Sequence, residues 1–250
     1  MTSRLVTTVL AGLALLVAGC DNNSSTPTSP SGGSLQITTT RPILRAGETA
    51  LLVMSGTSSA PVTNATWTST DTSVLTVSAT GVATAVRAGR VTVTASSGTS
   101  TGTLALRVVP DYQGTWSGGL ARVQVTCSVA STSPLCVPGA PTAGTLTLRV
   151  VQTGDQLTAT LVDSAEPTLT VPLTGQVQAD DQLALAGSGP AGSPTVRADV
   201  TTMRATIDAA LGSMNGSYQW LVARAPASGG TFQTDYQAQV QFRDIRRGPS

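Results

Sequence analysis

Residues 145–163 read TLTLRVVQTGDQLTATLVD, two runs of alternating apolar and polar side chains on either side of Thr153-Gly154-Asp155. Alternation is the pattern of a strand with one buried face, and a tight turn between two such runs predicts a β-hairpin. The apolar positions share one face, with Leu146, Leu148 and Val150 in the first run and Leu157, Ala159 and Leu161 in the second. This stretch therefore predicts an antiparallel fold built on a single apolar face.

The same pattern extends over residues 111–247 and predicts about eight strands. They lie near residues 115–127, 145–152, 156–163, 168–178, 182–187, 195–207, 213–223 and 235–245, with a second tight turn at Ala179-Asp180-Asp181. Successive hairpins with one apolar face favour an up-and-down meander that closes into a barrel, because closure leaves no strand edge unpaired. An open sandwich of the same strands is the alternative.

The first of these strands begins with Gly114-Thr-Trp116, which resembles the Gly-x-Trp of lipocalin-like barrels. The resemblance implies that the tryptophan plugs the barrel base and that an arginine after the last strand packs over it. Arg243, Arg246 and Arg247 are the candidates for this arginine. The sequence departs from that family in two ways: no long helix follows the last strand, and Thr234-Asp235-Tyr236 lies one hairpin later than expected.

The interior of such a barrel has two possible contents, since eight strands leave room for side chains or for one small ligand. A carrier would hold a small apolar ligand against interior residues such as Leu148, Leu161 and Tyr218. A barrel filled by its own leucine and valine side chains is the simpler expectation.

Residues 35–109 form a separate region of shorter alternating runs, broken by Gly, Asn and Pro as in a β-sandwich. Strands are expected near residues 35–37, 50–53, 66–69, 74–77, 81–85, 90–95 and 104–109. Several motifs of this region resemble the bacterial immunoglobulin-like domain of group 2 (BIG2) of intimin and invasin-type surface proteins. The residues that carry the resemblance are 47–49, 67–74, 77, 81–85, 88–89 and 91–95. The resemblance implies a spacer or adhesion module.

Each motif residue of this region has an expected structural role. Trp67 offers a large apolar face for the core between two sheets, with the valines at positions 74, 77, 91 and 93 packed around it. A carbohydrate-stacking platform is the alternative role for this tryptophan. Asp71 and Ser73 are expected to hydrogen-bond amides in a turn, and Gly81 and Gly89 to adopt positive φ.

The N-terminus has the features of an export signal followed by an anchor. Residues 1–4 carry one positive charge, and residues 5–18 are almost wholly apolar but too short to cross a bilayer. Leu16-Val17-Ala18-Gly19-Cys20 resembles the lipobox of bacterial lipoproteins. The resemblance implies removal of residues 1–19 and attachment of diacylglycerol and a further acyl chain, such as palmitate, to Cys20. Two or more acyl chains give stable membrane attachment.

Three further expectations concern the segment after Cys20, the membrane that holds the anchor, and the two remaining cysteines. Residues 20–34 contain no large apolar residue after the cysteine and should form a flexible linker. Asp21 resembles the inner-membrane retention signal of enterobacteria, a rule that does not extend to all bacteria, so the choice of membrane stays open. Cys127 and Cys136 are expected to form a disulfide in the oxidising envelope.

Composition restricts the chemistry that this protein can perform. Histidine is absent, which removes Ser-His-Asp and Cys-His catalysis, and a pair of cysteines without histidine is a poor metal site. Charged residues are only 11% with a net charge of +1, and no basic run is interleaved with aromatics, so nucleic acid is a poor partner. A hydrolase would need acids such as Asp163, Asp199 and Asp208 gathered in one cleft.

The sequence thus predicts an all-β, non-catalytic lipoprotein of the bacterial cell envelope, with its folded domains outside the cytoplasm and without cofactor or metal. The first domain spans 35–109 and the second spans 111–247. Its barrel would bind an unknown protein or glycan partner. The alternative is a carrier of a small apolar ligand.

Overall fold

The computed structural model describes residues 35–56, 62, 64–131, 133–140, 142–193, 195–225 and 230–249. The predicted signal peptide (1–19), the predicted lipidation site Cys20 and the predicted linker (20–34) lie outside the described residues.

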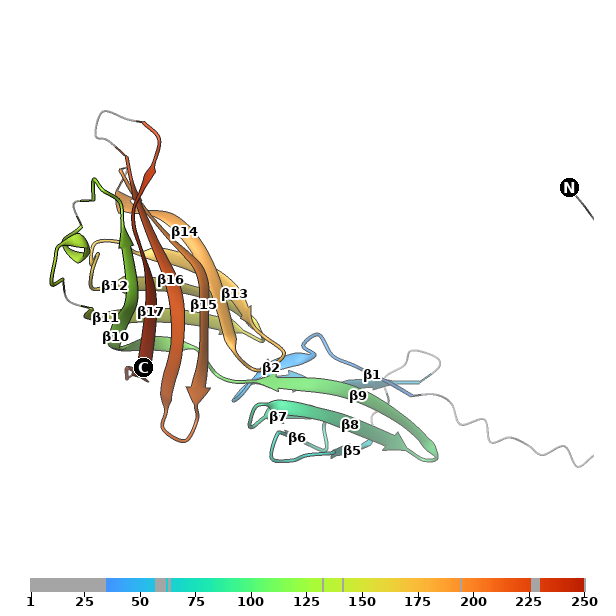
Figure 1. Ribbon diagram of the computed structural model, residues 1–250. Helices are drawn as coiled ribbons and strands as arrows, with labels where there is room; N and C mark the ends of the chain where they lie inside the picture. The colour runs from blue at the N-terminus through green and yellow to red at the C-terminus, as the bar shows by residue number, and fades with distance from the viewer. Residues whose placement is uncertain are drawn as a thin grey trace, which may run out of the picture. The chain divides into compact units, whose positions relative to one another are not determined.

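Nine short strands occupy the first described region (Figure 1). They are β1 (Gln36–Thr38), β2 (Ile43–Arg45), β3 (Thr49–Leu51), β4 (Val53–Ser55), β5 (Thr66–Ser69), β6 (Leu75–Val77), β7 (Val82–Ala85), β8 (Gly89–Ser97) and β9 (Ser100–Val109). They form sheets of order β2-β9-β8-β5, β3-β7-β6 and β1-β4. Pairing is antiparallel except between β2 and β9. Apolar side chains of these sheets meet in one core, which includes Leu44, Leu52, Leu75, Val93 and Val108.

Two expectations for this region were wrong in detail. The single strand expected at 50–53 is two strands, because the chain leaves one sheet for another at Leu52, whose N–H donates to Gly81 O at 2.8 Å. Gly89 does not have positive φ, whereas Gly81 does, at +80°. Gly89 is required for space instead, since a Cβ there would lie 2.8 Å from Val74 Cγ2.

Trp67 lies against the core and Asp71 accepts from a turn amide, as expected, whereas the hydroxyl of Ser73 bonds to the Asp71 carboxylate rather than to an amide. Trp67 packs against the core of this region and is half-buried. Ser73 donates to Asp71 Oδ1 through its backbone N–H at 2.9 Å and through its hydroxyl at 2.6 Å, which fixes the turn before β6. These hydrogen bonds hold the pKa of the Asp71 carboxyl below its ordinary value.

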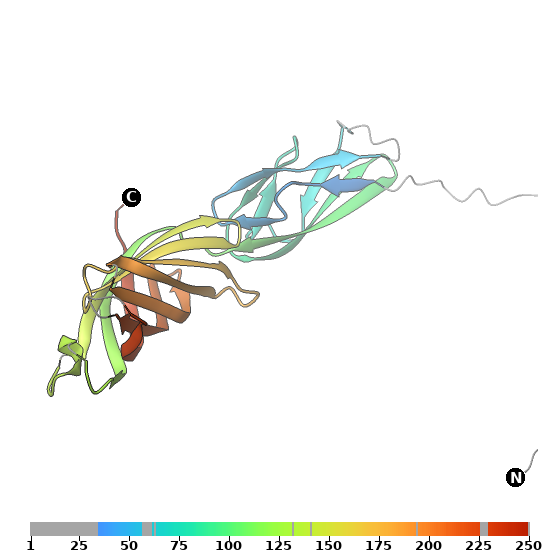
Figure 2. The same ribbon diagram turned by 90° about the horizontal axis from the view of Figure 1, so that it is seen from above.

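The second region is a closed barrel in which each strand pairs with the next and the last pairs with the first (Figure 2). Its strands are β10 (Gly114–Cys127), β11 (Ala143–Thr153), β12 (Gln156–Asp163), β13 (Val171–Val177), β14 (Leu183–Ser193), β15 (Val196–Asp208), β16 (Ser213–Arg224) and β17 (Gln233–Arg247). The β10–β17 ladder confirms the closed barrel and excludes the open sandwich. Both predicted tight turns join neighbouring strands, with positive φ at Gly154 and Asp181.

The predicted apolar faces point into the barrel. Buried side chains alternate along β11 and β12. One contiguous core of the barrel includes Leu146, Leu148, Val150, Leu157, Leu161, Leu173, Leu185, Tyr218, Trp220 and Phe242. Gly175 and Gly187 lie on strands β13 and β14 where the backbones approach closely, since a Cβ would lie about 2 Å from a neighbouring carbonyl oxygen. Strand alternation in the sequence therefore specifies both the barrel and its interior.

Trp116 is buried at the end of the barrel at which β10 begins. Its indole Nε1 donates to Tyr112 O at 2.8 Å, and Arg247 Cζ lies 4.7 Å from the ring centroid. The expected arginine over the tryptophan is therefore Arg247. Gly114 leaves it room, because a Cβ at that position would lie 3.2 Å from the arginine Cδ.

At the other end of β10, Cys127 and Cys136 form the predicted disulfide, with their Cα atoms 5.8 Å apart. It joins the strand to a 3-10 turn, η1 (Pro134–Cys136). Within the described part of the chain, no helical segment has the length and hydropathy of a membrane span.

Candidate functional site

The three residues predicted to line a ligand lie in the barrel interior, on three different strands. Leu148 (β11) and Leu161 (β12) are fully buried, and Tyr218 (β16) is 2% exposed. All three pack within the contiguous apolar core that contains both barrel tryptophans. Their proposed contact with a ligand stays a prediction.

A buried ion pair extends from this core toward the end of the barrel that carries the disulfide. Arg122 of β10 and Asp163 of β12 pair with side chains that are 2% and 1% exposed. Tyr218 donates its hydroxyl to Asp163 Oδ2 at 2.6 Å, and the N–H of Ala165 donates to Asp163 Oδ1 at 2.9 Å. Burial, together with the neighbouring Asp163 carboxylate, raises the pKa of Tyr218 well above its ordinary value.

A second polar cluster lies beyond the ion pair, around Arg224. Arg224 donates to Asp235 Oδ2 at 2.5 Å and to Glu166 Oε1 at 2.7 Å. Tyr236 donates to the same Glu166 oxygen at 3.3 Å, and Trp220 donates to the hydroxyl of Tyr236 at 3.2 Å. Burial alone would lower the pKa of Arg224, but the hydrogen bond to Asp235 and the charge of Glu166 raise it.

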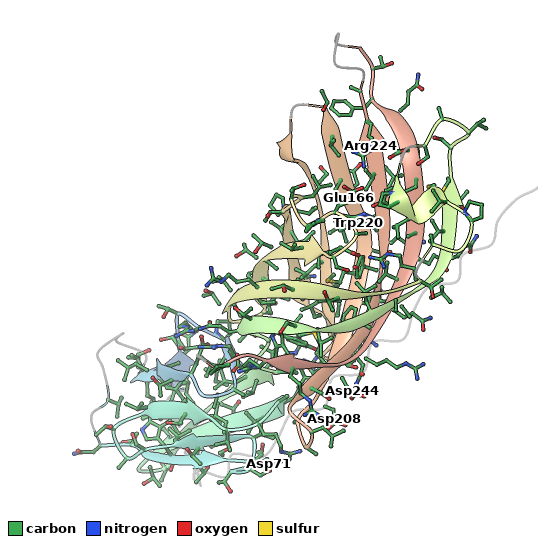
Figure 3. All side chains as sticks on the ribbon, turned by 90° about the vertical axis from the view of Figure 1, so that its left-hand side faces the viewer. Asp71, Glu166, Asp208, Trp220, Arg224 and Asp244 are labelled. Atoms are coloured by element: carbon green, nitrogen blue, oxygen red, sulfur yellow. A yellow bond between two sulfur atoms is a disulfide. The ribbon has the colours of Figure 1, made fainter. Side chains whose placement is uncertain are left out.

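These contacts tie opposite walls of the barrel together. Glu166 lies in the connection between β12 and β13, whereas Arg224 lies at the end of β16, which is four strands from β12 and three from β13 in a closed ring of eight. Figure 3 shows Glu166, Arg224 and Trp220 together at one end of the barrel, with Asp208 and Asp244 at the other. Every buried side-chain nitrogen or oxygen of the described residues has a hydrogen-bond partner. The cluster therefore links these two parts of the barrel wall through hydrogen bonds.

The three acids considered for hydrolysis have separate partners. Asp163 holds Arg122 in the interior, whereas Asp199 pairs with Arg197 at 3.0 Å on the barrel surface. Asp208 accepts from the N–H groups of Ala210 and Leu211 in the turn after β15. Among the described residues, no group of three His, Cys, Asp or Glu side chains is placed to hold a metal ion.

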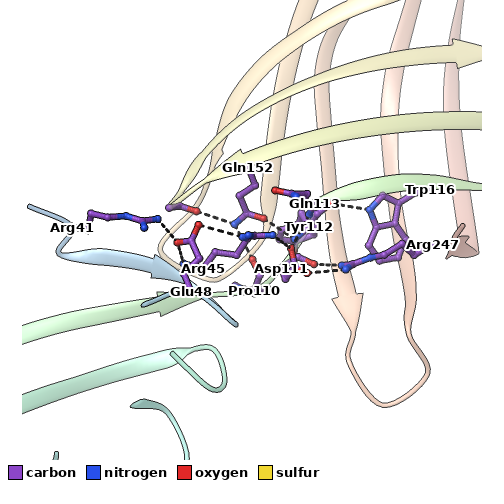
Figure 4. Close-up of polar contacts among 11 residues, drawn as sticks. Arg41, Arg45, Glu48, Pro110, Asp111, Tyr112, Gln113, Trp116, Gln152 and Arg247 are labelled. Carbon is purple, nitrogen blue, oxygen red and sulfur yellow. Dashed lines mark hydrogen bonds and ion pairs between the residues drawn. The ribbon is translucent and has the colours of Figure 1, made fainter. Parts of the chain in front are cut away.

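Asp111, between β9 and β10, is the centre of a third polar cluster (Figure 4). Arg45 donates to Asp111 Oδ1 at 3.0 Å, and Arg247 donates to Asp111 Oδ2 at 2.7 Å. Burial would raise the pKa of Asp111, but the hydrogen bonds from the two arginines hold it below its ordinary value. Glu48 extends the cluster, because it accepts from Arg41 at 2.6 Å and from the backbone N–H of Arg45 at 2.9 Å.

The backbone beside Asp111 is also fixed by hydrogen bonds. Gln152 accepts from the N–H of Tyr112 at 2.7 Å and donates to Pro110 O and Gly154 O, both at 2.9 Å (Figure 4). The hydroxyl of Tyr112 donates to Asp181 O at 2.8 Å and to Ala205 O at 3.1 Å. Burial raises the pKa of this tyrosine to about 12. Thus the short connection between β9 and β10 is held by side chains on both sides.

Sequence reasoning missed these polar clusters, although one signal was present. Arg122 lies two residues after the inward Leu120, and Asp163 lies two residues after the inward Leu161. Both charged residues therefore occupy strand positions whose side chains point toward the buried face, which predicts that they lie inside the barrel. Their pairing depends on the register across β11, and the contact between Arg45 and Asp111 joins residues 66 positions apart. Neither pairing has a local signal.

Comparisons with known proteins identify the first region. The family model described as Bacterial Ig-like domain (group 2) matches residues 33–108. No curated protein matches the sequence.

Two solved structures of surface layer proteins share weak similarity with the chain. The crystal structure of the S-layer protein rSbsC(31-844) is 15% identical, with 81% of this chain and 40% of that chain covered and a TM-score of 0.25. The structure of surface layer protein SbsC, domains 4-9, is 14% identical, with 83% and 42% covered and a TM-score of 0.26. The chain thus spans less than half the length of either, and these TM-scores define no shared overall fold. The family match alone carries the conclusion that residues 33–108 are a bacterial Ig-like domain of group 2, followed by a closed eight-stranded antiparallel barrel.

Proposed function

We propose that this protein is a lipid-anchored component of the bacterial cell envelope, in which the Ig-like domain carries a barrel that binds a partner without catalysis. The single observation that carries the proposal is the group 2 Ig-like domain at residues 33–108. The lipobox-like Leu16–Cys20 supports attachment through Cys20, and the polar segment that follows, which has no large apolar residue, supports a tether.

The packing of the barrel supports binding at its outside rather than in its interior. Leu148, Leu161 and Tyr218 are buried among the barrel's own side chains. The ion pairs of Asp163 and Glu166 lie toward the end that carries the disulfide, which supports a closed barrel at that end. A closed and filled barrel is a rigid scaffold for a protein or glycan partner.

Acyl attachment is tested by growing the source bacterium with labelled palmitate and comparing the wild-type chain with Cys20→Ala. We expect label and membrane association in the wild type and loss of both in the variant. The matched control is Cys127→Ala/Cys136→Ala, which keeps Cys20 and should keep the label. A wild-type chain without label, or a labelled Cys20→Ala chain, would refute the anchor.

The content of the barrel is tested by native mass spectrometry of the protein extracted from its own cells. A mass that equals the acylated polypeptide with one disulfide supports the filled barrel. A reproducible excess mass that disappears on denaturation would overturn this proposal and make the barrel a carrier.

A further inference from the structure

A pocket of about 470 Å³ lies beside Asp111. Its lining includes Arg45 from β2, Arg149 from β11 and Arg247 from the end of β17, together with Asp111 and the backbone around Gly114. Residues 33–250 form one compact unit, so these side chains belong to a single body of the protein.

The lining of this pocket is positively charged. It contains three arginines and one carboxylate, so its formal charge is +2, although the whole chain carries only +1. Glu48 outside the lining pairs with Arg45, but it also pairs with Arg41, which adds a further positive charge nearby. A concave site with a net positive charge attracts anionic ligands.

Two of the three arginines are held in position before any ligand arrives. Arg45 is fixed by Glu48 and Asp111, and Arg247 is fixed by Asp111 and by its stacking over Trp116 (Figure 4). Ordered guanidinium groups lose little side-chain entropy when they bind.

Arg149 differs from these two arginines. Its side chain is exposed, and within the described residues it makes no hydrogen bond or ion pair. It extends outward from β11 at the position paired with Thr115. The pocket therefore combines two positioned guanidinium groups with one whose donors are available to a ligand.

We propose that this pocket is a binding site for a phosphate group, either as the free anion or as a phosphate ester such as a lipid or polymer headgroup. The guanidinium fork matches the oxygen geometry of phosphate and gives charge-assisted, bidentate hydrogen bonds. Arg149 provides the new contacts, while Arg45 and Arg247 supply the surrounding positive charge. Asp111 bridges those two arginines and orients both guanidinium groups.

The test is isothermal titration calorimetry of the full chain with inorganic phosphate and, separately, with glycerol 3-phosphate, at ionic strength held constant with sodium chloride. The same titrations use Arg149→Gln, Arg149→Lys and the matched control Arg204→Gln. Arg204 is also exposed, but it lies on β15 and outside this pocket.

We expect Arg149→Gln to weaken phosphate binding about tenfold or more, the loss of one charge-assisted hydrogen bond. Arg149→Lys should retain an intermediate affinity, and Arg204→Gln should bind as the wild type does. Similar affinity for the two probes identifies the phosphate oxygens as the recognised group, whereas preference for glycerol 3-phosphate identifies an ester headgroup. Absence of binding to both probes, or equal weakening by Arg204→Gln, overturns the proposal.

Discussion

Asp163→Asn should destabilise the barrel strongly, because it removes the charge that neutralises a buried arginine. The two side chains of this ion pair are 2% and 1% exposed, so water cannot replace the lost carboxylate. The amide that replaces it has one acceptor oxygen for the three donors that Asp163 now satisfies, from Arg122, Tyr218 and Ala165. Its NH₂ group adds donors beside a guanidinium, which has no acceptor.

The expected loss is about 3–5 kcal/mol in the free energy of unfolding, the range for removing one partner of a buried ion pair. The matched control is Asp199→Asn, which breaks an ion pair with the exposed Arg197 and should cost less than about 1 kcal/mol. Replacing both buried charges, as in Arg122→Met/Asp163→Leu, should recover much of the loss, because no charge then stays buried without a partner.

The assay is urea unfolding followed by tryptophan fluorescence in a Trp67→Phe background. The chain has three tryptophans, so the two that remain, Trp116 and Trp220, both report on the barrel. A loss for Asp163→Asn that is no larger than the loss for Asp199→Asn would refute the argument that this ion pair is sealed from water.

Two further predictions concern the disulfide and a buried tyrosine. Cys127→Ser/Cys136→Ser should lower the free energy of unfolding of the barrel by about 2.5 kcal/mol through loop-closure entropy, measured by the same fluorescence assay. An unchanged unfolding midpoint would contradict it. Burial raises the pKa of Tyr112 from 10.0 to about 12, so between these pH values the folded protein keeps a proton that the unfolded chain loses. Stability should therefore fall as pH rises from 10 to 12, and Tyr112→Phe should reduce that slope; equal slopes for the two proteins would argue against the shift.

Local patterning explains which parts of this fold could be predicted. Along β11 and β12, apolar residues alternate with polar ones, so the sequence alone predicts these strands and the inward face of residues such as Leu148. In the Ig-like domain, Leu51 to Val53 look like one continuous strand, yet the chain changes sheets at Leu52. The residues up to Leu51 pair with β7, whereas those from Val53 onward pair with β1. Strand β2 has only three residues, too few for any periodicity to appear.

The polar clusters were less predictable, because they depend on register and closure. In the sequence, Asp163 is an isolated acid with no visible partner. In the folded barrel it pairs with Arg122, which lies two strands away. Arg149 has no sequence signal that separates it from Arg204, since both are exposed arginines on alternating strands. Only the folded chain shows that one of them adjoins Arg45 and Arg247.

The ladder between β10 and β17 has a consequence for how this barrel can be recombined. Trp116 near the start of the barrel is paired with Arg247 at its end, so the entry and exit of the barrel are neighbours in space. A domain of this kind can be grafted into a surface loop of another protein, or circularly permuted with a short added linker, without separating its first and last strands. Pairing of the first and last strands thus makes the eight-stranded unit suitable for insertion into another protein as one block.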